Sequence, residues 1–141
     1  MRKTALSADR KLVYLDASAL VKLVVQESET QDLERHLADD VVQATSRLAG
    51  VEVPRAARVA NPSEELQHEV QRMLGACMLV DVSDHVLRTA AALASREIRT
   101  LDAIHLATAL YIDADELVAY DRRLLDAAAR QGLDVAAPGW S

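Results

Sequence analysis

The fold class of this chain follows from residues 12–22, LVYLDASALVK. The first four form a short apolar run, which is typical of a strand buried on both faces. Asp16 ends the run, and a helical pattern begins directly after it. Ligands of open α/β sheets bind at the carboxyl ends of strands, and an ionised carboxylate beside a buried strand is costly without a cation or a donor. Asp16 is therefore a site candidate; the alternative is that it only caps the next helix.

The remaining sequence alternates short strand patterns with helical ones, which predicts an α/β fold: a central parallel sheet flanked by helices on both faces. Thr45-Ser46 is a natural N-cap for a helix that contains Pro54, so we expect a kink there or a displaced boundary near Gly50. The expected strands cover 12–15, 41–44, 78–82, 116–120 and 133–136, and the expected helices cover 18–26, 29–37, 47–59, 64–76, 83–97, 101–112 and 121–131.

Composition restricts the class of protein. With 141 residues, half of them apolar, the chain is long enough for one domain, which we place at 11–137 between a disordered leader at 1–10 and a tail at 138–141. The single cysteine excludes an internal disulfide and a cysteine-based zinc site. No membrane span or signal peptide is recognisable, so we expect a cytoplasmic protein. The net charge of −6 argues only weakly against a nucleic-acid partner, because it hides how the charge is distributed.

Three further acids stand where a solvated acid is not expected. Glu52 falls on the apolar face of its helix, where the alternative is an ion pair with Arg55 one turn away. Asp102 lies in the first turn of an almost entirely apolar helix, where the helix dipole alone would favour it. Asp121 repeats the arrangement of Asp16 at the end of another strand, where it could also be a plain N-cap.

Four converging carboxylates would repel one another strongly, and a hard divalent cation is the usual remedy. Mg²⁺ and Mn²⁺ prefer oxygen ligands and leave room for a phosphate oxygen and for a water that attacks phosphorus. The sequence therefore predicts a magnesium or manganese site at Asp16, Glu52, Asp102 and Asp121. We interpret His105, close to Asp102 on the same helix, as a packed, hydrogen-bonded residue rather than a ligand.

Four segments carry a resemblance to a known family: LDASALVK around Asp16, ATSRLAGVEVPRA around Glu52, RTLDAIHLATAL around Asp102 and VAYDRRLLDAA around Asp121. In order and spacing they resemble the PIN-domain nucleases, most closely the VapC toxins of bacterial toxin–antitoxin pairs. The resemblance runs from Leu12 to about Val135. It implies a PIN fold, Mg²⁺- or Mn²⁺-dependent endonucleolytic cleavage of RNA, a cognate VapB-like antitoxin that covers the site, a toxin homodimer and a toxin–antitoxin hetero-oligomer.

The resemblance places the four acids on the family's metal-binding positions and Ser18 on a hydroxyl residue that supports the first acid. Two positions depart from the pattern: Ala119 stands where many relatives have a hydroxyl residue, and Pro54 is unusual so close to the catalytic Glu52. Basic residues near the acids in sequence are candidate RNA-phosphate contacts, although each could equally be a solvated surface charge. They are Lys22, Arg47, Arg99 and Arg122.

Other families that place an aspartate at a strand end fit less well. A haloacid-dehalogenase-type phosphatase would have Asp-x-Asp where this chain has Ser18 in the third position, and a receiver domain would need an acidic pair there. A non-catalytic protein that keeps the fold and only binds its partner remains the rival interpretation. The helices expected over 18–37 and 47–76 are rich in apolar residues, which predicts a groove for an antitoxin helix, unless those helices pack on one another.

Overall fold

The computed structural model describes residues 10–93 and 96–140. Five strands form one sheet in the order β3-β2-β1-β4-β5, and every neighbouring pair is parallel. The α/β fold with a central parallel sheet is confirmed. The elements are β1 (Lys11–Leu15), α1 (Ala17–Val24), α2 (Thr30–His36), β2 (Val41–Ser46), α3 (Ala49–Ala60), α4 (Glu64–Gly75), β3 (Met78–Val80), α5 (Asp84–Ala92), α6 (Thr100–Tyr111), β4 (Glu116–Val118), α7 (Arg122–Arg130) and β5 (Asp134–Ala136).

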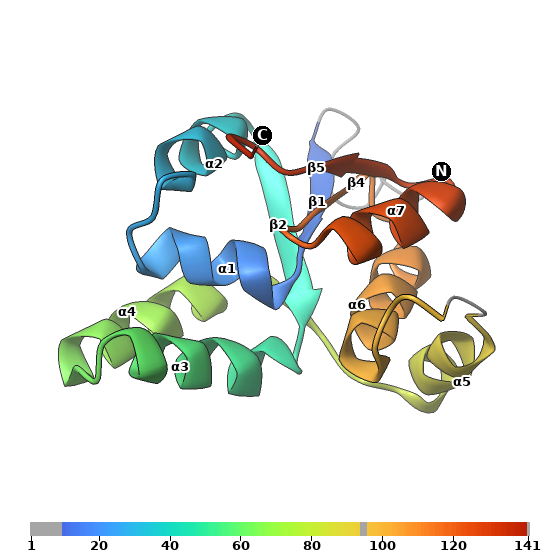
Figure 1. Ribbon diagram of the computed structural model, residues 1–141, viewed down its shortest axis with the longest axis horizontal. Helices are drawn as coiled ribbons and strands as arrows, with labels where there is room; N and C mark the ends of the chain where they lie inside the picture. Colours follow the sequence, from blue (N-terminus) through green and yellow to red (C-terminus); the bar gives the residue numbers. More distant parts are fainter. Residues whose placement is uncertain (1–9, 94–95, 141) are drawn as a thin grey trace.

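The central strand β1 supplies both halves of the core, because its side chains alternate between the two faces of the sheet. Leu12 and Tyr14 face a cluster that includes α6 and α7. Val13 and Leu15 face a second cluster, built with the buried side chains of α1 to α4. Figure 1 shows these two groups of helices on opposite sides of the sheet. Helices therefore cover both faces, as expected for a parallel sheet.

The strand order creates a switch point between β1 and β4. From β1 the chain proceeds to β2 and β3 on one side, then crosses to β4 and β5 on the other. Leu15 pairs with Val118, and the backbone N–H of Asp16 donates to the carbonyl of Val118 at 3.2 Å. The carboxyl ends of β1 and β4 thus lie side by side, at the position where open α/β sheets bind ligands.

Several expected boundaries were wrong, each for a local reason. Thr45 and Ser46 do not cap α3 but end β2, and the Thr45 hydroxyl donates to the carbonyl of Leu15 at 2.7 Å. Helix α3 begins at Ala49, which agrees with a displaced boundary near Gly50. It continues through Pro54, although proline cannot donate the helical hydrogen bond to the residue four positions earlier.

Two elements are shorter than expected. Helix α5 ends at Ala92 rather than at 97, because the backbone becomes extended at Leu93 and its side chain packs against the α6–α7 core. Strand β4 ends at Val118 rather than at 120, because the N–H of Tyr120 donates to the hydroxyl of Ser18 instead of continuing the sheet.

The two ends of the chain lie partly outside the described residues. Of the expected leader at 1–10, only Arg10 is described, and its guanidinium pairs with Asp40 at 2.8 Å. The expected tail packs back on the domain, because the hydroxyl of Tyr120 donates to the carbonyl of Pro138 at 2.8 Å. Within residues 10–93 and 96–140, no helix combines the length and the apolar character that crossing a membrane requires.

Most of the apolar side chains of α1 to α4 are buried or partly buried. These helices pack on one another and on the sheet, with Leu20, Leu33 and Val53 fully buried between them. Val51 and Val59 are the large apolar side chains of this group that stay well exposed, at 61% and 88%. Mutual packing, the alternative to an open groove, therefore accounts for most of this apolar surface.

We predict that Leu20→Ala lowers the free energy of unfolding by about 2–5 kcal/mol, because it leaves a cavity between α1 and the other helices of this layer. Val59→Ala is the matched control and should change it by no more than about 0.5 kcal/mol. Urea denaturation of both variants measures the difference. Equal losses would contradict the packing described here.

Candidate active site

Asp16 is the most buried of the four predicted acids, with 4% of its surface exposed. It caps α1, and its Oδ1 accepts hydrogen bonds from the Ser18 hydroxyl at 2.7 Å and the Ala19 N–H at 3.0 Å. Burial raises the pKa of Asp16 to about 6, although these two hydrogen bonds and the nearby His105 oppose the shift. The capping alternative is therefore part of the answer, but a plain surface cap would not be buried.

Ser18 connects the ends of the two central strands. Its hydroxyl donates to Asp16, and its oxygen accepts the backbone N–H of Tyr120 at 2.9 Å. Tyr120 directly precedes Asp121, so one hydroxyl connects the segments that carry two of the acids. Ala119, the departure noted in the sequence, is fully buried, and its N–H donates to Ala136.

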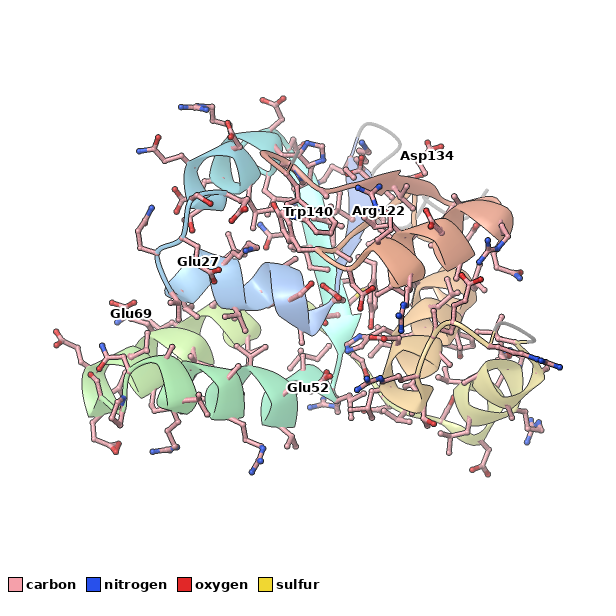
Figure 2. All side chains as sticks on the ribbon, in the orientation of Figure 1. Glu27, Glu52, Glu69, Arg122, Asp134 and Trp140 are labelled. Atoms are coloured by element: carbon pink, nitrogen blue, oxygen red, sulfur yellow. The ribbon has the colours of Figure 1, made fainter. Side chains whose placement is uncertain are left out.

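Glu52 is held by a histidine from across the site. It lies in the first turn of α3, with its side chain 21% exposed, and its Oε1 is 2.6 Å from Nε2 of His105 on α6. Figure 2 shows Glu52 at the end of α3 that lies nearest α6. No ion pair with Arg55, the alternative weighed for Glu52, occurs among the described residues.

His105 is itself fixed by a buried tyrosine. The ring is 1% exposed, and its Nδ1 lies 2.7 Å from the hydroxyl of Tyr14. Because a carboxylate only accepts hydrogen bonds, Nε2 donates to Glu52, and in the neutral ring Nδ1 accepts from Tyr14. His105 is thus packed and hydrogen-bonded as expected. Its link to Tyr14 was missed, although a tyrosine inside an apolar strand indicates a buried hydroxyl that needs a partner.

Asp102 and Asp121 complete the group. Asp102 lies in the first turn of α6. Its pKa is raised mainly by burial and further by the charges of Asp121 and Glu52. Asp121 caps α7 and accepts the N–H groups of Arg123 and Leu124 at 2.9 and 3.3 Å through Oδ1. The charge of Asp102 also raises the pKa of Asp16. Four distant segments of the chain therefore bring electrostatically coupled acids to one edge of the sheet.

Three of the four carboxylates have an oxygen that is available to bind a hard cation. Asp16, Glu52 and Asp121 each use one carboxylate oxygen for a hydrogen bond, while the other oxygen accepts none from the described residues. Anchored carboxylates with a free oxygen are the ligands that Mg²⁺ and Mn²⁺ prefer. In the described part of the chain, however, no three His, Cys, Asp or Glu side chains stand close enough together to hold an ion as they are.

The four basic residues proposed near the acids have different surroundings. Lys22 pairs with Glu27 and Glu29, both at 3.0 Å, and Arg47 pairs with Asp81. Arg99 and Arg122 are exposed, and neither has a carboxylate within ion-pair distance among the described residues. Two of these charges are thus already compensated, and two are available to a ligand.

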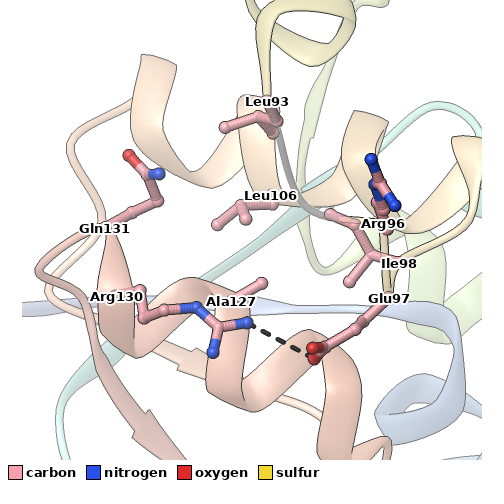
Figure 3. Close-up of a pocket in the computed structure, with 8 residues that line it drawn as sticks. All are labelled: Leu93, Arg96, Glu97, Ile98, Leu106, Ala127, Arg130 and Gln131. Atoms are coloured by element: carbon pink, nitrogen blue, oxygen red, sulfur yellow. Dashed lines mark ion pairs between the residues drawn. The ribbon is translucent and has the colours of Figure 1, made fainter.

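A separate pocket lies between α7 and the segment that leads into α6. Aliphatic side chains including Leu93, Leu106 and Ala127 line it, and an ion pair between Arg130 and Glu97 at 3.5 Å lies at its rim (Figure 3). Arg96 and Gln131 also line this pocket, but none of the four acids at the strand ends and helix starts does, so the carboxylate edge remains the candidate site.

Comparison with known proteins identifies the family of the chain. The family model for the PIN domain matches residues 13–130. Ribonuclease VapC46 of Mycobacterium tuberculosis is 43% identical over 128 residues, covering 89% of this chain and 97% of the relative. Ribonuclease VapC47 of the same species is 34% identical over 135 residues, covering 91% and 98%.

Solved structures share the fold at lower identity. The crystal structure of Mycobacterium tuberculosis VapC20, a Sarcin-Ricin loop cleaving toxin, superposes with a TM-score of 0.71 at 16% identity, covering 89% of this chain and 99% of that one. A toxin–antitoxin complex from Klebsiella pneumoniae gives 0.69 at 21% identity, covering 89% and 97%.

We predict that the metal-free protein loses stability between pH 4 and 6 because of Asp16. The folded chain retains this proton up to about pH 6, whereas the unfolded chain releases it near the ordinary value of 3.8. The folded state therefore binds more protons in this window, and the free energy of unfolding falls as the pH rises. At about 1.4 kcal/mol per pKa unit, the loss attributable to Asp16 is about 3 kcal/mol.

The variant Asp16→Asn keeps an acceptor for Ser18 and Ala19 but cannot ionise, so it should be the more stable protein at pH 7 in EDTA. Urea denaturation at pH 4 and pH 7 measures this change. Asp126→Asn, which alters an exposed acid of α7, is the control and should follow the wild type at both pH values. Parallel pH profiles for Asp16→Asn and the wild type would contradict the prediction.

Proposed function

This chain belongs to the PIN-domain family, and from that premise we propose that it is a divalent-metal-dependent endoribonuclease, the toxin of a toxin–antitoxin pair. The observation that carries the proposal is electrostatic: the charges of Asp121 and Glu52 raise the pKa of Asp102, and the charge of Asp102 raises that of Asp16. The names of the relatives, ribonucleases of the VapC group, support RNA as the substrate.

We propose that the four carboxylates hold one or two Mg²⁺ or Mn²⁺ ions. When bound, such an ion would supply Lewis-acid polarisation of a phosphate oxygen and a water of lowered pKa. A shared cation would offset the repulsion among the carboxylates, which contributes to the raised pKa of Asp16 and Asp102, because each carboxylate is attracted to the same ion. In this scheme no side chain of the protein becomes covalently attached to the RNA.

The chain's own residues give the site its geometry. Ser18 and the Ala19 N–H fix one oxygen of Asp16, and the start of α7 fixes one oxygen of Asp121. His105, backed by Tyr14, fixes one oxygen of Glu52. These three carboxylates are thereby oriented before a ligand arrives, which lowers the cost of assembling the site. Arg99 and Arg122 have free charge to offer to RNA phosphates, more than Lys22 or Arg47.

The rival interpretation is a protein that keeps the fold and acts only by binding. Burying Asp16 costs stability in the absence of a cation, as its raised pKa indicates. A module that bound no metal would gain by replacing it with an apolar or amide residue. The carboxylate set therefore favours the enzyme.

We also propose a VapB-like antitoxin, a toxin homodimer and a hetero-oligomer of the two proteins. Two solved structures of the same fold are VapBC complexes, from Rickettsia felis and from nontypeable Haemophilus influenzae. An antitoxin segment with an Arg or Lys that reaches the acids would compete with the metal for the same charge.

We predict that Asp102→Asn and Asp16→Asn each abolish RNA cleavage while the fold persists, because both substitutions remove charge and preserve shape. Far-UV circular dichroism checks the fold, and a labelled RNA in Mg²⁺ or Mn²⁺ checks cleavage. The wild type should also gain thermal stability in Mn²⁺, by about 2.7 kcal/mol at a hundredfold excess over Kd, and Asp102→Asn should not.

Asp126→Asn serves as the control, since it removes an exposed charge from α7 and should alter neither readout. Cleavage retained by Asp16→Asn or Asp102→Asn with an unchanged metal response would refute the proposed site. A wild-type melting temperature that stays constant across millimolar Mn²⁺ would favour the binding module.

We predict that the small open reading frame beside the gene encodes the antitoxin and that the two proteins co-purify after co-expression. Expression of this chain alone should arrest growth, and expression of Asp102→Asn should not. In the complex the Mn²⁺-dependent stabilisation should shrink, because a basic side chain occupies the carboxylates. Failure to co-purify, together with normal growth during expression of the chain alone, would remove the toxin assignment.

A further inference from the structure

Trp140, the only tryptophan of the sequence, lies beside the candidate site. Its ring centroid is 6.1 Å from that of Tyr120, and the guanidinium carbon of Arg122 lies 5.2 Å from its ring. Tyr120 and Arg122 are the two neighbours of Asp121 in the chain, so both sides of this acid contact one indole. Figure 2 shows Trp140 and Arg122 next to each other.

The indole is held in a defined position. The hydroxyl of Tyr120 donates to the carbonyl of Pro138, and the backbone N–H of Trp140 donates to the carbonyl of Ala137 at 3.0 Å. Between them, Gly139 has a φ of +80°, and a Cβ there would lie 2.6 Å from an oxygen of Asp32. The turn therefore requires glycine, both for its backbone conformation and for its close approach to α2.

Despite this support, Trp140 is not buried. Its residue is 38% exposed, so part of the indole remains open after the contacts with Tyr120 and Arg122. The other large apolar residues exposed in the described part of the chain are Val51, Val59, Val82, Leu87, Leu101 and Tyr111, none of which belongs to α2, α7 or the tail. Trp140 is thus an isolated flat surface, unlike the wide apolar patch that a protein partner would need.

The cations around Tyr120 and Trp140 differ in availability. Lys22 lies 4.8 Å from the ring centre of Tyr120, but Glu27 and Glu29 neutralise it. Arg122 is exposed, and no carboxylate among the described residues lies within ion-pair distance of it. A partly exposed indole with an uncompensated guanidinium over its ring offers the remaining exposed ring surface to a base and the charge to its phosphate, the two contacts that single-stranded nucleic acids use.

We propose that Trp140 and Arg122 form a subsite for one unpaired nucleotide next to the scissile bond, with the base stacked on the indole and its phosphate contacted by Arg122. This inference rests on the proposed ribonuclease function and extends it, because it assigns single-stranded RNA as the substrate form at this edge of the site. The subsite contributes to RNA affinity and leaves the carboxylate chemistry unchanged.

The test uses the intrinsic fluorescence of Trp140, which no other tryptophan obscures. The Asp102→Asn protein in EDTA is titrated with single-stranded oligo(A), oligo(U), an abasic ribose-phosphate oligomer and an RNA duplex. We expect saturable quenching by the two oligomers that carry unpaired bases, and little by the abasic oligomer or the duplex. Binding of a labelled oligo(A), followed by anisotropy, gives the affinities of variants that lack the tryptophan.

In that assay Trp140→Leu should weaken binding by about tenfold, as expected for the loss of one stacked base, and Trp140→Phe should restore much of it. Arg122→Gln should reduce the slope of log affinity against log salt by about 0.7, the value for one phosphate contact on a single strand. Arg130→Gln, which removes the same charge from the other end of α7, is the matched control and should leave the slope unchanged.

The outcomes separate this inference from the proposed function. Cleavage of RNA by the wild type, with no quenching and with Trp140→Leu binding as tightly as its parent, would overturn the subsite and leave the nuclease intact. Quenching and weakened binding without cleavage by the wild type would support the subsite and refute the nuclease. If Trp140→Leu leaves RNA binding unchanged but prevents association with the antitoxin, the indole is a protein contact and the proposal falls.

Discussion

The parallel pairing of β1 with β4 is the constraint on which the candidate site depends. It brings together the ends of two strands whose sequences are about a hundred residues apart, and it does so where the chain reverses its direction of winding. The Ser18 hydroxyl then joins these ends, since it donates to Asp16 and accepts from Tyr120. A slip of one residue in this register would turn each following side chain to the opposite face and separate the acids.

The second constraint is electrostatic. A cluster of carboxylates at a partly buried edge opposes folding, as the raised pKa values of Asp16 and Asp102 show. The fold tolerates the cluster because backbone and side-chain donors anchor one oxygen of Asp16, Glu52 and Asp121. The same anchoring leaves the second oxygens of these three residues free within the described structure. Stability and ligand binding therefore make opposite demands on this edge, which is characteristic of functional sites.

The surroundings of the acids divide into two environments. On the side of α3 and α6, the buried side chains of Tyr14 and His105 are hydrogen-bonded in series and hold Glu52, so they act as a rigid support. On the side of α7, the surface is exposed and cationic, with Arg122 over the indole of Trp140. A phosphodiester substrate needs both a fixed carboxylate site and a surface that receives the flanking nucleotides, and this edge of the sheet offers a candidate for each.

The fold class and the positions of Asp16 and Asp121 at strand ends could be predicted from the sequence, because hydrophobic periodicity is a local property and the carboxyl ends of parallel strands share one edge. The sequence also indicated Glu52 and Asp102, since each interrupts an apolar helical face. The groups that hold these acids in place are seen only in the folded structure. His105 and Glu52 are 53 residues apart, and Tyr14 and His105 are 91 apart, so no local pattern reports these hydrogen bonds. The same holds for Thr45, which was expected to cap a helix but bonds to the central strand, and for Trp140, whose contacts depend on a turn that returns the chain end to Asp121. Periodicity describes which residues are buried, whereas the partners of a buried polar group depend on which elements pack together.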